Sequence, residues 1–117
     1  MIEYILMILL GTYKPTPPKI IPLVDPVVVQ VDIYDEIWGD VSDDAKRIIE
    51  CESGGNPDAH NLGSDSRGLM QIHYPTWHKI FGDVDYYDIE TNLRMGKYIY
   101  SQTGDFSQWS CRYVLDG

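Results

Sequence analysis

The chain has 117 residues, of which 44% are hydrophobic, and this length and composition fit one small globular domain. Its formal net charge of -9 excludes the nucleic-acid-binding class, because a protein that binds phosphate backbones presents a basic face. The same charge gives no long-range attraction to anionic membranes and is compatible with a neutral or zwitterionic polymer substrate. We expect a monomer.

The first thirteen residues contain an apolar run from Tyr4 to Leu10. The run is too short to span a bilayer comfortably and resembles the apolar region of a signal peptide. However, Glu3 precedes it in place of Lys or Arg, and no clean small-x-small cleavage site follows. We therefore expect residues 1–13 to be an export signal or a membrane tether, with a strand or helix packed on the domain as the alternative.

Residues 14–38 are expected to form an extended arm or linker. The prolines in this segment are Pro15, Pro17, Pro18, Pro22 and Pro26. Their spacing prevents a regular helix and favours a polyproline-like backbone. The sequence from Val27 to Tyr34 has β propensity, which indicates either a short strand or a continued extended arm. The compact domain is then expected at residues 39–117.

The segment from Ser42 to Gly55 predicts a helix that carries a carboxylate on its inner face. Ser42 can cap its start, the Gly54-Gly55 pair can end it in a left-handed conformation, and Pro57 prevents its continuation. The residues at i, i+3, i+4 and i+7 on one face are Ala45, Ile48, Ile49 and Glu52. Because partial burial disfavours the charged form of a carboxylate, Glu52 is a candidate general acid. The alternative is a glutamate that reaches solvent or pairs with an arginine.

The rest of the chain predicts further helices separated by loops. A polar loop (58–67) and a short apolar segment (68–72) come first, then a helix that begins near Pro75 and ends at Gly82. Asp88 is expected to cap the next helix, which ends at Gly104, and a last helix covers about 106–115. Gly96 inside the longer helix indicates close approach of another element. The residues expected to face inward are Trp77, Ile80, Phe81, Ile89, Leu93, Gly96, Ile99, Tyr100, Phe106, Trp109, Tyr113 and Val114.

The two cysteines, Cys51 and Cys111, lie far apart in the sequence. No CxxC or Cys/His spacing indicates zinc, and the three histidines do not form an i, i+4 pair, so no metal site is predicted. We expect a disulfide between Cys51 and Cys111, with two reduced core thiols as the alternative. A disulfide would imply an oxidising compartment.

Two motifs resemble those of a known family. Glu52-Ser53-Gly54-Gly55-Asn56-Pro57, followed by Gly68-Leu69-Met70-Gln71-Ile72, resembles the signature of the soluble lytic transglycosylases, within the lysozyme-like superfamily. The stretch from Asp88 to Gly96 is similar to the helix after the active-site segment, and the resemblance covers about 41–117. Cys51 directly before Glu52 is also similar to the resuscitation-promoting factors, relatives with a disulfide near the cleft. The resemblance implies a mainly α, lysozyme-like helical domain behind a proline-rich arm.

The same resemblance implies that Glu52 is the catalytic acid/base. It assigns cleft or substrate contacts to Gln71, Gly68, Met70, Asn61 and His73. For Gln71, Gly68 and Met70 the alternative is a turn or core role. An insertion before Gly68 blurs the match for Asn61 and His73, so exposed loop positions are their alternative.

The C-terminus departs from the family pattern. Relatives carry Ala-Tyr-Asn-x-Gly in the last helix, whereas this chain has Arg112-Tyr113-Val114-Leu115-Asp116-Gly117. The hydroxyl of Tyr113 is expected to reach Glu52 or the N-acetyl group of the substrate, with a core aromatic as the alternative. The asparagine is absent, so the glycan contact that it makes in relatives has no equivalent side chain here.

The implied activity is cleavage of the β-1,4 bond between N-acetylmuramic acid and N-acetylglucosamine in peptidoglycan strands, without a cofactor. Glu52 would protonate the leaving oxygen and then accept the proton of the C6 hydroxyl, giving a 1,6-anhydro product. The alternatives are lysozyme-type hydrolysis, with Asp65 as the nearest second carboxylate, and a non-catalytic glycan-binding relative. We expect an exported, periplasmic or wall-associated protein, with a phage virion or phage lysis as another setting.

Overall fold

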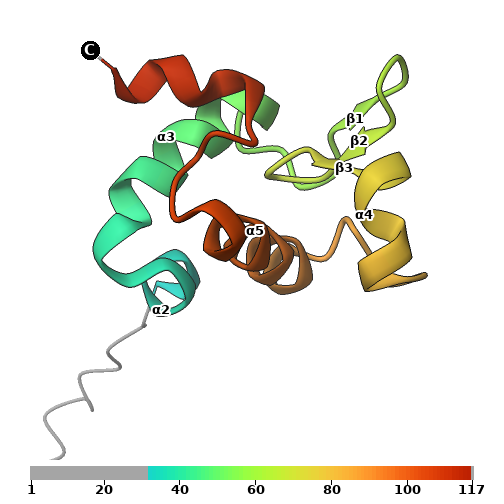
Figure 1. The fold of residues 1–117 in the computed structure, drawn as a ribbon, viewed down its shortest axis with the longest axis horizontal. Coiled ribbons are helices and arrows are strands. Elements are labelled where there is room, and N and C mark those ends of the chain that lie inside the picture. Colours follow the sequence, from blue (N-terminus) through green and yellow to red (C-terminus); the bar gives the residue numbers. More distant parts are fainter. Residues whose placement is uncertain (1–31, 117) are drawn as a thin grey trace, which may run out of the picture. The chain divides into compact units, whose positions relative to one another are not determined.

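The structure is a computed structural model that describes residues 32–116. The expected signal or tether at residues 1–13 and the proline-rich part of the arm lie outside the described residues. The elements in chain order are α2 (Ile33–Trp38), η1 (Gly39–Val41), α3 (Ser42–Ser53), β1 (His60–Asn61), β2 (Ser66–Arg67), β3 (Ile72–His73), α4 (Tyr74–Phe81), α5 (Ile89–Thr103) and η2 (Ser110–Leu115) (Figure 1). The mainly α-helical class is confirmed. Within residues 32–116, no helix combines the length and the apolar character that a bilayer crossing needs.

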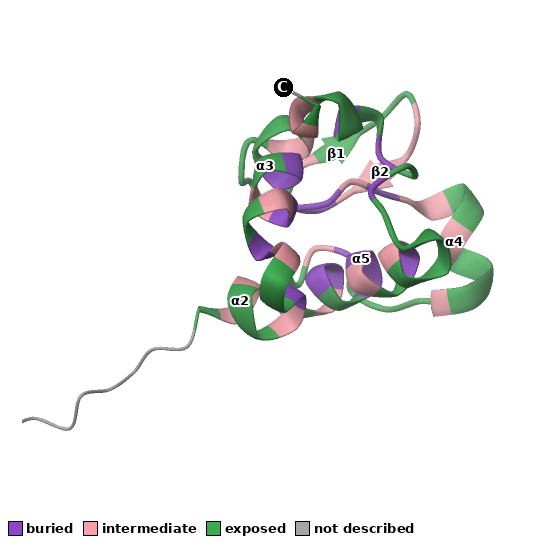
Figure 2. Ribbon diagram, turned by 60° about the vertical axis from the view of Figure 1, so that its left-hand side comes forward, coloured by how far each residue is buried: buried purple, intermediate pink, exposed green. Residues whose placement is uncertain are grey.

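The helices pack around α5. Figure 1 shows α2 and α3 on one side of α5 and the strands with α4 on the other, and Figure 2 likewise shows α2 and α3 on the side of α5 away from α4. The buried apolar residues are Trp38, Ala45, Ile48, Ile49, Leu69, Met70, Ile72, Tyr86, Leu93, Met95, Ile99, Phe106, Trp109 and Cys111. They come from α2, α3, β3, α5, η2 and the segments that connect the elements, so a single core holds the two sides together.

The helix α3 has the predicted inner face and the predicted end, but a different start. Gly54 closes it in the left-handed conformation, with φ 64°. At the other end Val41 is the N-cap, and the hydroxyl of Ser42 donates a hydrogen bond to Asp35 of α2. The expectation that Ser42 caps α3 is therefore wrong, because its side chain is buried against the preceding helix.

The folded domain begins earlier than the boundary expected between residues 38 and 39. Ile33 and Tyr34 lie in α2, not in a strand, and Asp32 caps this helix by accepting from the Tyr34 N–H at 2.9 Å. Trp38 is 1% exposed and stacks on Phe106 at a ring-centroid distance of 5.4 Å. The aromatic side chain at the end of α2 thus belongs to the core.

Three two-residue strands form a small antiparallel sheet that the sequence did not reveal. The strand order is β1-β2-β3, with His60 opposite Arg67 and Ser66 opposite His73. Strands this short carry no detectable alternation, so the polar loop and the apolar segment showed no β signal.

The last helix is shorter than expected. Only Ser110–Leu115 is helical, as a 3₁₀ segment, and Tyr113 is 65% exposed. Ile80 and Ile89, also expected to face inward, are exposed. Each of these three positions fits a helical apolar stripe, but no other element covers it.

Gly96 lies where α5 approaches the apolar segment between β2 and β3. A Cβ atom at this position would collide with the Met70 Sδ atom and press on the Trp38 ring. Met70 is fully buried there. The close approach predicted at Gly96 is therefore confirmed, and its cause is the Met70 side chain.

We expect Gly96→Ala to lower the free energy of unfolding by about 1–3 kcal/mol, because the added methyl overpacks the core. Helix propensity alone predicts the opposite sign, a gain of about 1 kcal/mol. Urea unfolding of the variant, with Ser101→Ala on the exposed face of α5 as control, decides between them. A more stable Gly96→Ala protein would show that the Met70 side chain can move to accommodate the added methyl group without strain.

Candidate active site

Glu52 lies in the last turn of α3, one residue before the helix ends. Its side chain is half-buried and lines a cleft, whereas Glu50 is exposed. The periodicity of α3 explains this position, because Glu52 continues the stripe of Ala45, Ile48 and Ile49 beyond the edge of the core. A carboxylate at that edge can meet a ligand.

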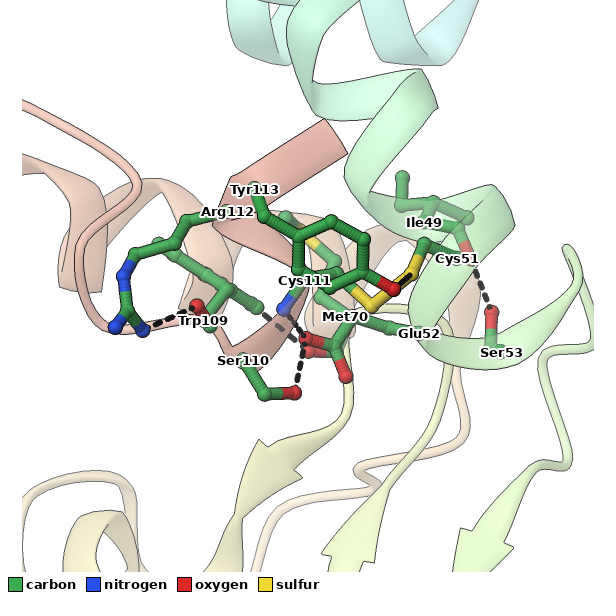
Figure 3. The surroundings of a disulfide bond; sticks show 10 residues. All are labelled: Ile49, Cys51, Glu52, Ser53, Met70, Trp109, Ser110, Cys111, Arg112 and Tyr113. Carbon is green, nitrogen blue, oxygen red and sulfur yellow. Dashed lines mark hydrogen bonds between the residues drawn. A yellow bond between two sulfur atoms is a disulfide. The ribbon is translucent and has the colours of Figure 1, made fainter. Parts of the chain in front are cut away.

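A disulfide joins Cys51 of α3 to Cys111 of η2, with their Cα atoms 6.0 Å apart (Figure 3). The disulfide expectation is confirmed and the alternative of two reduced thiols is wrong. The bond closes a sequence separation of 60 residues. Because Glu52 follows one cysteine and Ser110 precedes the other, the cross-link brings these two side chains together.

One carboxylate oxygen of Glu52 has two hydrogen-bond donors. Oε1 accepts from the Ser110 hydroxyl at 2.9 Å and from the Cys111 N–H at 3.0 Å (Figure 3). Among the described residues, none donates to Oε2. The expected partner of a structural glutamate, an arginine, does not contact it within residues 32–116. The carboxylate is thus held on one side and open on the other.

The cleft beside Glu52 has a volume of about 360 Å³. Its lining residues are Glu52, Asn61, Ser64, Ser66, Gln71, Ile72, His73, Trp77, Ile99, Gln108, Trp109 and Ser110. One wall comes from the end of α3 and the start of η2, and the other from the sheet and α4. Within residues 32–116, Glu52 is the one carboxylate that lines it.

Gln71 lines the same cleft as Glu52, from the turn before β3. Its backbone is left-handed, with φ 51°, and its Nε2 donates to the carbonyls of Ala59 at 3.1 Å and Gly68 at 2.9 Å. These two bonds tie the amide nitrogen to the loop. The carbonyl oxygen accepts no hydrogen bond from a described residue, so it can accept one from a ligand.

Asn61 and His73 also line the cleft, from β1 and β3. The Asn61 Oδ1 atom accepts from the Gly63 N–H at 3.0 Å, which leaves its amide nitrogen to donate elsewhere. The His73 Nδ1 atom lies 2.7 Å from the Thr76 Oγ1 atom, which orients the ring at the start of α4. The structure therefore brings Glu52, Gln71, Asn61 and His73 into one cleft.

Gly68 and Met70 do not line the cleft. Met70 is buried in the core, and a Cβ atom at Gly68 would collide with the Asn92 amide and the Tyr86 carbonyl. With φ 77°, Gly68 also occupies the left-handed region that suits glycine. The structure places both residues in the turn and core roles that were their alternative.

Asn92 is the buried residue that holds this turn, and it was not among the residues predicted from the sequence. It is 0% exposed. Its Oδ1 accepts from the Met70 N–H at 2.8 Å, and its Nδ2 donates to the carbonyls of Arg67 at 3.0 Å and Tyr86 at 2.8 Å. An asparagine on the inner face of a predicted helix was the available signal, because a buried amide needs partners.

Tyr113 does not reach Glu52. Its hydroxyl lies 3.5 Å from the Cys51 Sγ atom, and the side chain is 65% exposed. The structure therefore does not show the expected contact with Glu52 or the alternative of a core aromatic, and contact with the N-acetyl group of the substrate stays a prediction. The short η2 segment places the ring over the disulfide (Figure 3).

Asp65 is bound in a separate polar cluster outside the cleft lining. Its carboxylate accepts from the Arg67 Nε at 2.9 Å and lies 2.8 Å from the His60 Nε2. These hydrogen bonds, the one from Arg67 first, lower the pKa of Asp65 below its ordinary value of 3.8. Asp65 therefore stabilises the loop between β1 and β2.

Ser110 lines the cleft and donates a hydrogen bond to Glu52, and it was not predicted from the sequence. The pairing of Cys51 with Cys111 could have indicated it, because the neighbours of two bonded cysteines lie close together. Trp77, Trp109 and Gln108 were missed as cleft residues too. Within residues 32–116, no group of three His, Cys, Asp or Glu side chains could hold a metal ion.

Comparison with known proteins identified one family. A family model described as "Lysozyme like domain" matches residues 44–111, which include Glu52, Gln71 and both cysteines. Neither the curated proteins nor the solved structures yielded a match.

We expect reduction of the disulfide to lower the free energy of unfolding by about 2–4 kcal/mol, because the unfolded chain then gains freedom. Cys51 is exposed, so a reductant has access to the bond. Urea unfolding with and without dithiothreitol measures the loss. The double variant Cys51→Ser/Cys111→Ser should have the same free energy of unfolding as the reduced protein, and dithiothreitol should not change it. Equal stability in all cases would contradict the expectation.

We expect Asp65→Asn to lower the melting temperature near neutral pH but not in acid. Because the folded pKa of Asp65 lies below 3.8, its carboxylate stabilises the fold above that pH, and the contribution is lost as the pH falls through the lowered pKa. In thermal melts from pH 7 to pH 2, the difference in melting temperature between the variant and wild type should become smaller as the pH falls. The exposed Asp58→Asn should show no such difference. A difference that persists in acid would contradict this assignment.

Proposed function

The chain belongs to the lysozyme-like domain family, and from that premise we propose that it is a peptidoglycan lytic transglycosylase. It cleaves the β-1,4 bond between N-acetylmuramic acid and N-acetylglucosamine, with Glu52 as the only catalytic acid/base. The observation that carries the proposal is a cleft whose lining has a single carboxylate, held by two donors and open on its other oxygen.

The first step of the proposed reaction breaks the glycosidic bond. The protonated Glu52 carboxyl gives its proton to the glycosidic oxygen, which keeps the electron pair of the broken bond. The carbonyl oxygen of the substrate N-acetyl group stabilises the positive charge that develops at the anomeric carbon, as in substrate-assisted glycosidases. The Ser110 hydroxyl and the Cys111 N–H stabilise the carboxylate that results.

The second step closes the 1,6-anhydro ring. The Glu52 carboxylate accepts the proton of the muramic acid C6 hydroxyl, and the C6 oxygen bonds to the anomeric carbon as the acetyl oxygen departs. Glu52 is thereby returned to its protonated form. The free Gln71 carbonyl oxygen, the Asn61 amide, the His73 ring and the half-buried Trp77 supply groups that can orient the sugars.

The single carboxylate favours this route over hydrolysis. A glycosidase that uses water or a covalent intermediate usually has a second carboxylate about 5–9.5 Å from the first. Asp65, the loop residue considered as a second carboxylate, accepts hydrogen bonds from Arg67 and does not line the cleft. The substrate must then provide both the charge stabilisation and the nucleophile.

The disulfide supports an exported protein. Disulfides persist in oxidising compartments, and peptidoglycan lies in such compartments. We propose that the protein acts in the periplasm or at the cell wall, or as part of a phage virion or lysis system.

We expect Glu52→Gln to lower the rate of wall digestion by about 10²–10⁴-fold, because the amide cannot donate a proton to the leaving oxygen. The matched control is Asp65→Asn, the same carboxyl-to-amide change outside the cleft, which should retain activity. Mass spectrometry identifies the products in digests of purified peptidoglycan. Wild type and Asp65→Asn should both give 1,6-anhydro-muropeptides.

Three outcomes would contradict the proposal. Reducing muramic acid ends would indicate a lysozyme-type hydrolase. Binding to walls without digestion by the wild type would indicate a glycan-binding relative. Equal digestion by wild type and Glu52→Gln would exclude Glu52 as the acid.

A further inference from the structure

The two oxygens of the Glu52 carboxyl group have different surroundings. Oε1 accepts from the Ser110 hydroxyl and the Cys111 N–H, whereas no described residue donates to Oε2. A main-chain N–H can only donate, so a proton on Oε1 would face a donor at 3.0 Å. The neutral carboxyl group therefore carries its proton on Oε2.

We infer that Ser110 is a positioning residue which, with the Cys111 N–H, reserves Oε1 as an acceptor and makes Oε2 the one oxygen that exchanges protons with the substrate. This inference rests on the proposed function and adds which atom acts and which side chain selects it. Ser110 touches Glu52, and its assigned role is exerted through Glu52.

Proton transfer then runs through one atom in both steps. Oε2–H gives its proton to the glycosidic oxygen as the bond to the anomeric carbon breaks. The same Oε2, now unprotonated, takes the proton of the C6 hydroxyl as the C6 oxygen attacks. One proton leaves and one returns, and the carboxyl group does not rotate between the steps.

The donors owe their position to contacts between η2 and α3. The Cys51–Cys111 disulfide fixes the start of η2, and the Arg47 guanidinium of α3 donates to the Val114 carbonyl near its end. Cys111 is 7% exposed. The η2 segment, which begins with both donors, is therefore attached to α3 at two points.

The test compares Ser110→Ala with Ser110→Thr, which keeps the hydroxyl, and with Ser101→Ala. Ser101 lies on the exposed face of α5, and its hydroxyl bonds only to its own helix and to Gln102. A hydrogen bond to a charged group contributes about 1.5–3 kcal/mol, which corresponds to about ten- to a hundredfold in rate.

For Ser110→Ala we expect kcat to fall by that factor with KM unchanged, because the lost donor stabilises the charge that develops on Glu52. Ser110→Thr should recover most of the activity, and Ser101→Ala should match wild type. A merely structural role would not give a loss that is confined to kcat and recovered by the threonine hydroxyl.

Carboxyl ¹³C NMR of labelled glutamate gives a readout that needs no activity. The Glu52 signal, assigned by its loss in Glu52→Gln, should move in Ser110→Ala at neutral pH and return toward its wild-type position in Ser110→Thr, because the carboxylate loses and then regains a hydrogen-bond donor. An unmoved signal in Ser110→Ala would overturn the inference. Wild-type kcat in Ser110→Ala, or an equal loss in the alanine and threonine variants, would also overturn it. If Glu52→Gln itself remains active, the proposed function has failed instead.

Discussion

The disulfide that joins α3 to η2 is the constraint on which the candidate active site depends. Glu52 lies at the end of α3, which positions its carboxylate but supplies no hydrogen-bond donor to it. Both donors to the carboxylate come from residues 110 and 111, and the disulfide holds them beside α3. A segment almost 60 positions away in the chain therefore sets the orientation of the acid.

The opposite wall of the cleft depends on a buried amide. Asn92 of α5 satisfies one N–H and two carbonyls of the chain around it, and Gly68 leaves room for it. Because an unpaired polar group in the core is costly, this set of bonds permits one conformation of the turn. Gln71 belongs to that turn, so α5 helps to position a second residue of the cleft that Glu52 lines.

Several of the protein's acidic side chains stabilise local structure. Asp88 caps α5 by accepting from the Thr91 N–H and hydroxyl, which lowers the pKa of Asp88. Hydrogen bonds from Lys46 lower the pKa of Asp32 in the same way, and Asp65 is bound to Arg67. Glu52 is thereby left as the one carboxylate among the cleft-lining residues. A net charge of -9 is thus compatible with a cleft that is almost free of charge.

The sequence by itself determined that α3, α4 and α5 form and where each of them ends, because helix ends depend on neighbours within a few positions. Gly54, Gly82 and Gly104 end α3, α4 and α5, and Asp88 begins the last of these. It also singled out Glu52, since a carboxylate in an apolar stripe is visible as a break in the periodicity.

Only the tertiary structure decided which of the remaining side chains meet. Met70 and Gln71 are neighbours in one apolar segment, yet Met70 packs on Gly96 and Gln71 turns into the cleft. Ser110 binds Glu52 and Tyr113 does not, although both belong to the segment expected to be the last helix. Such contacts join residues far apart in the chain, and their geometry is set by the packing of other elements, which no local pattern encodes.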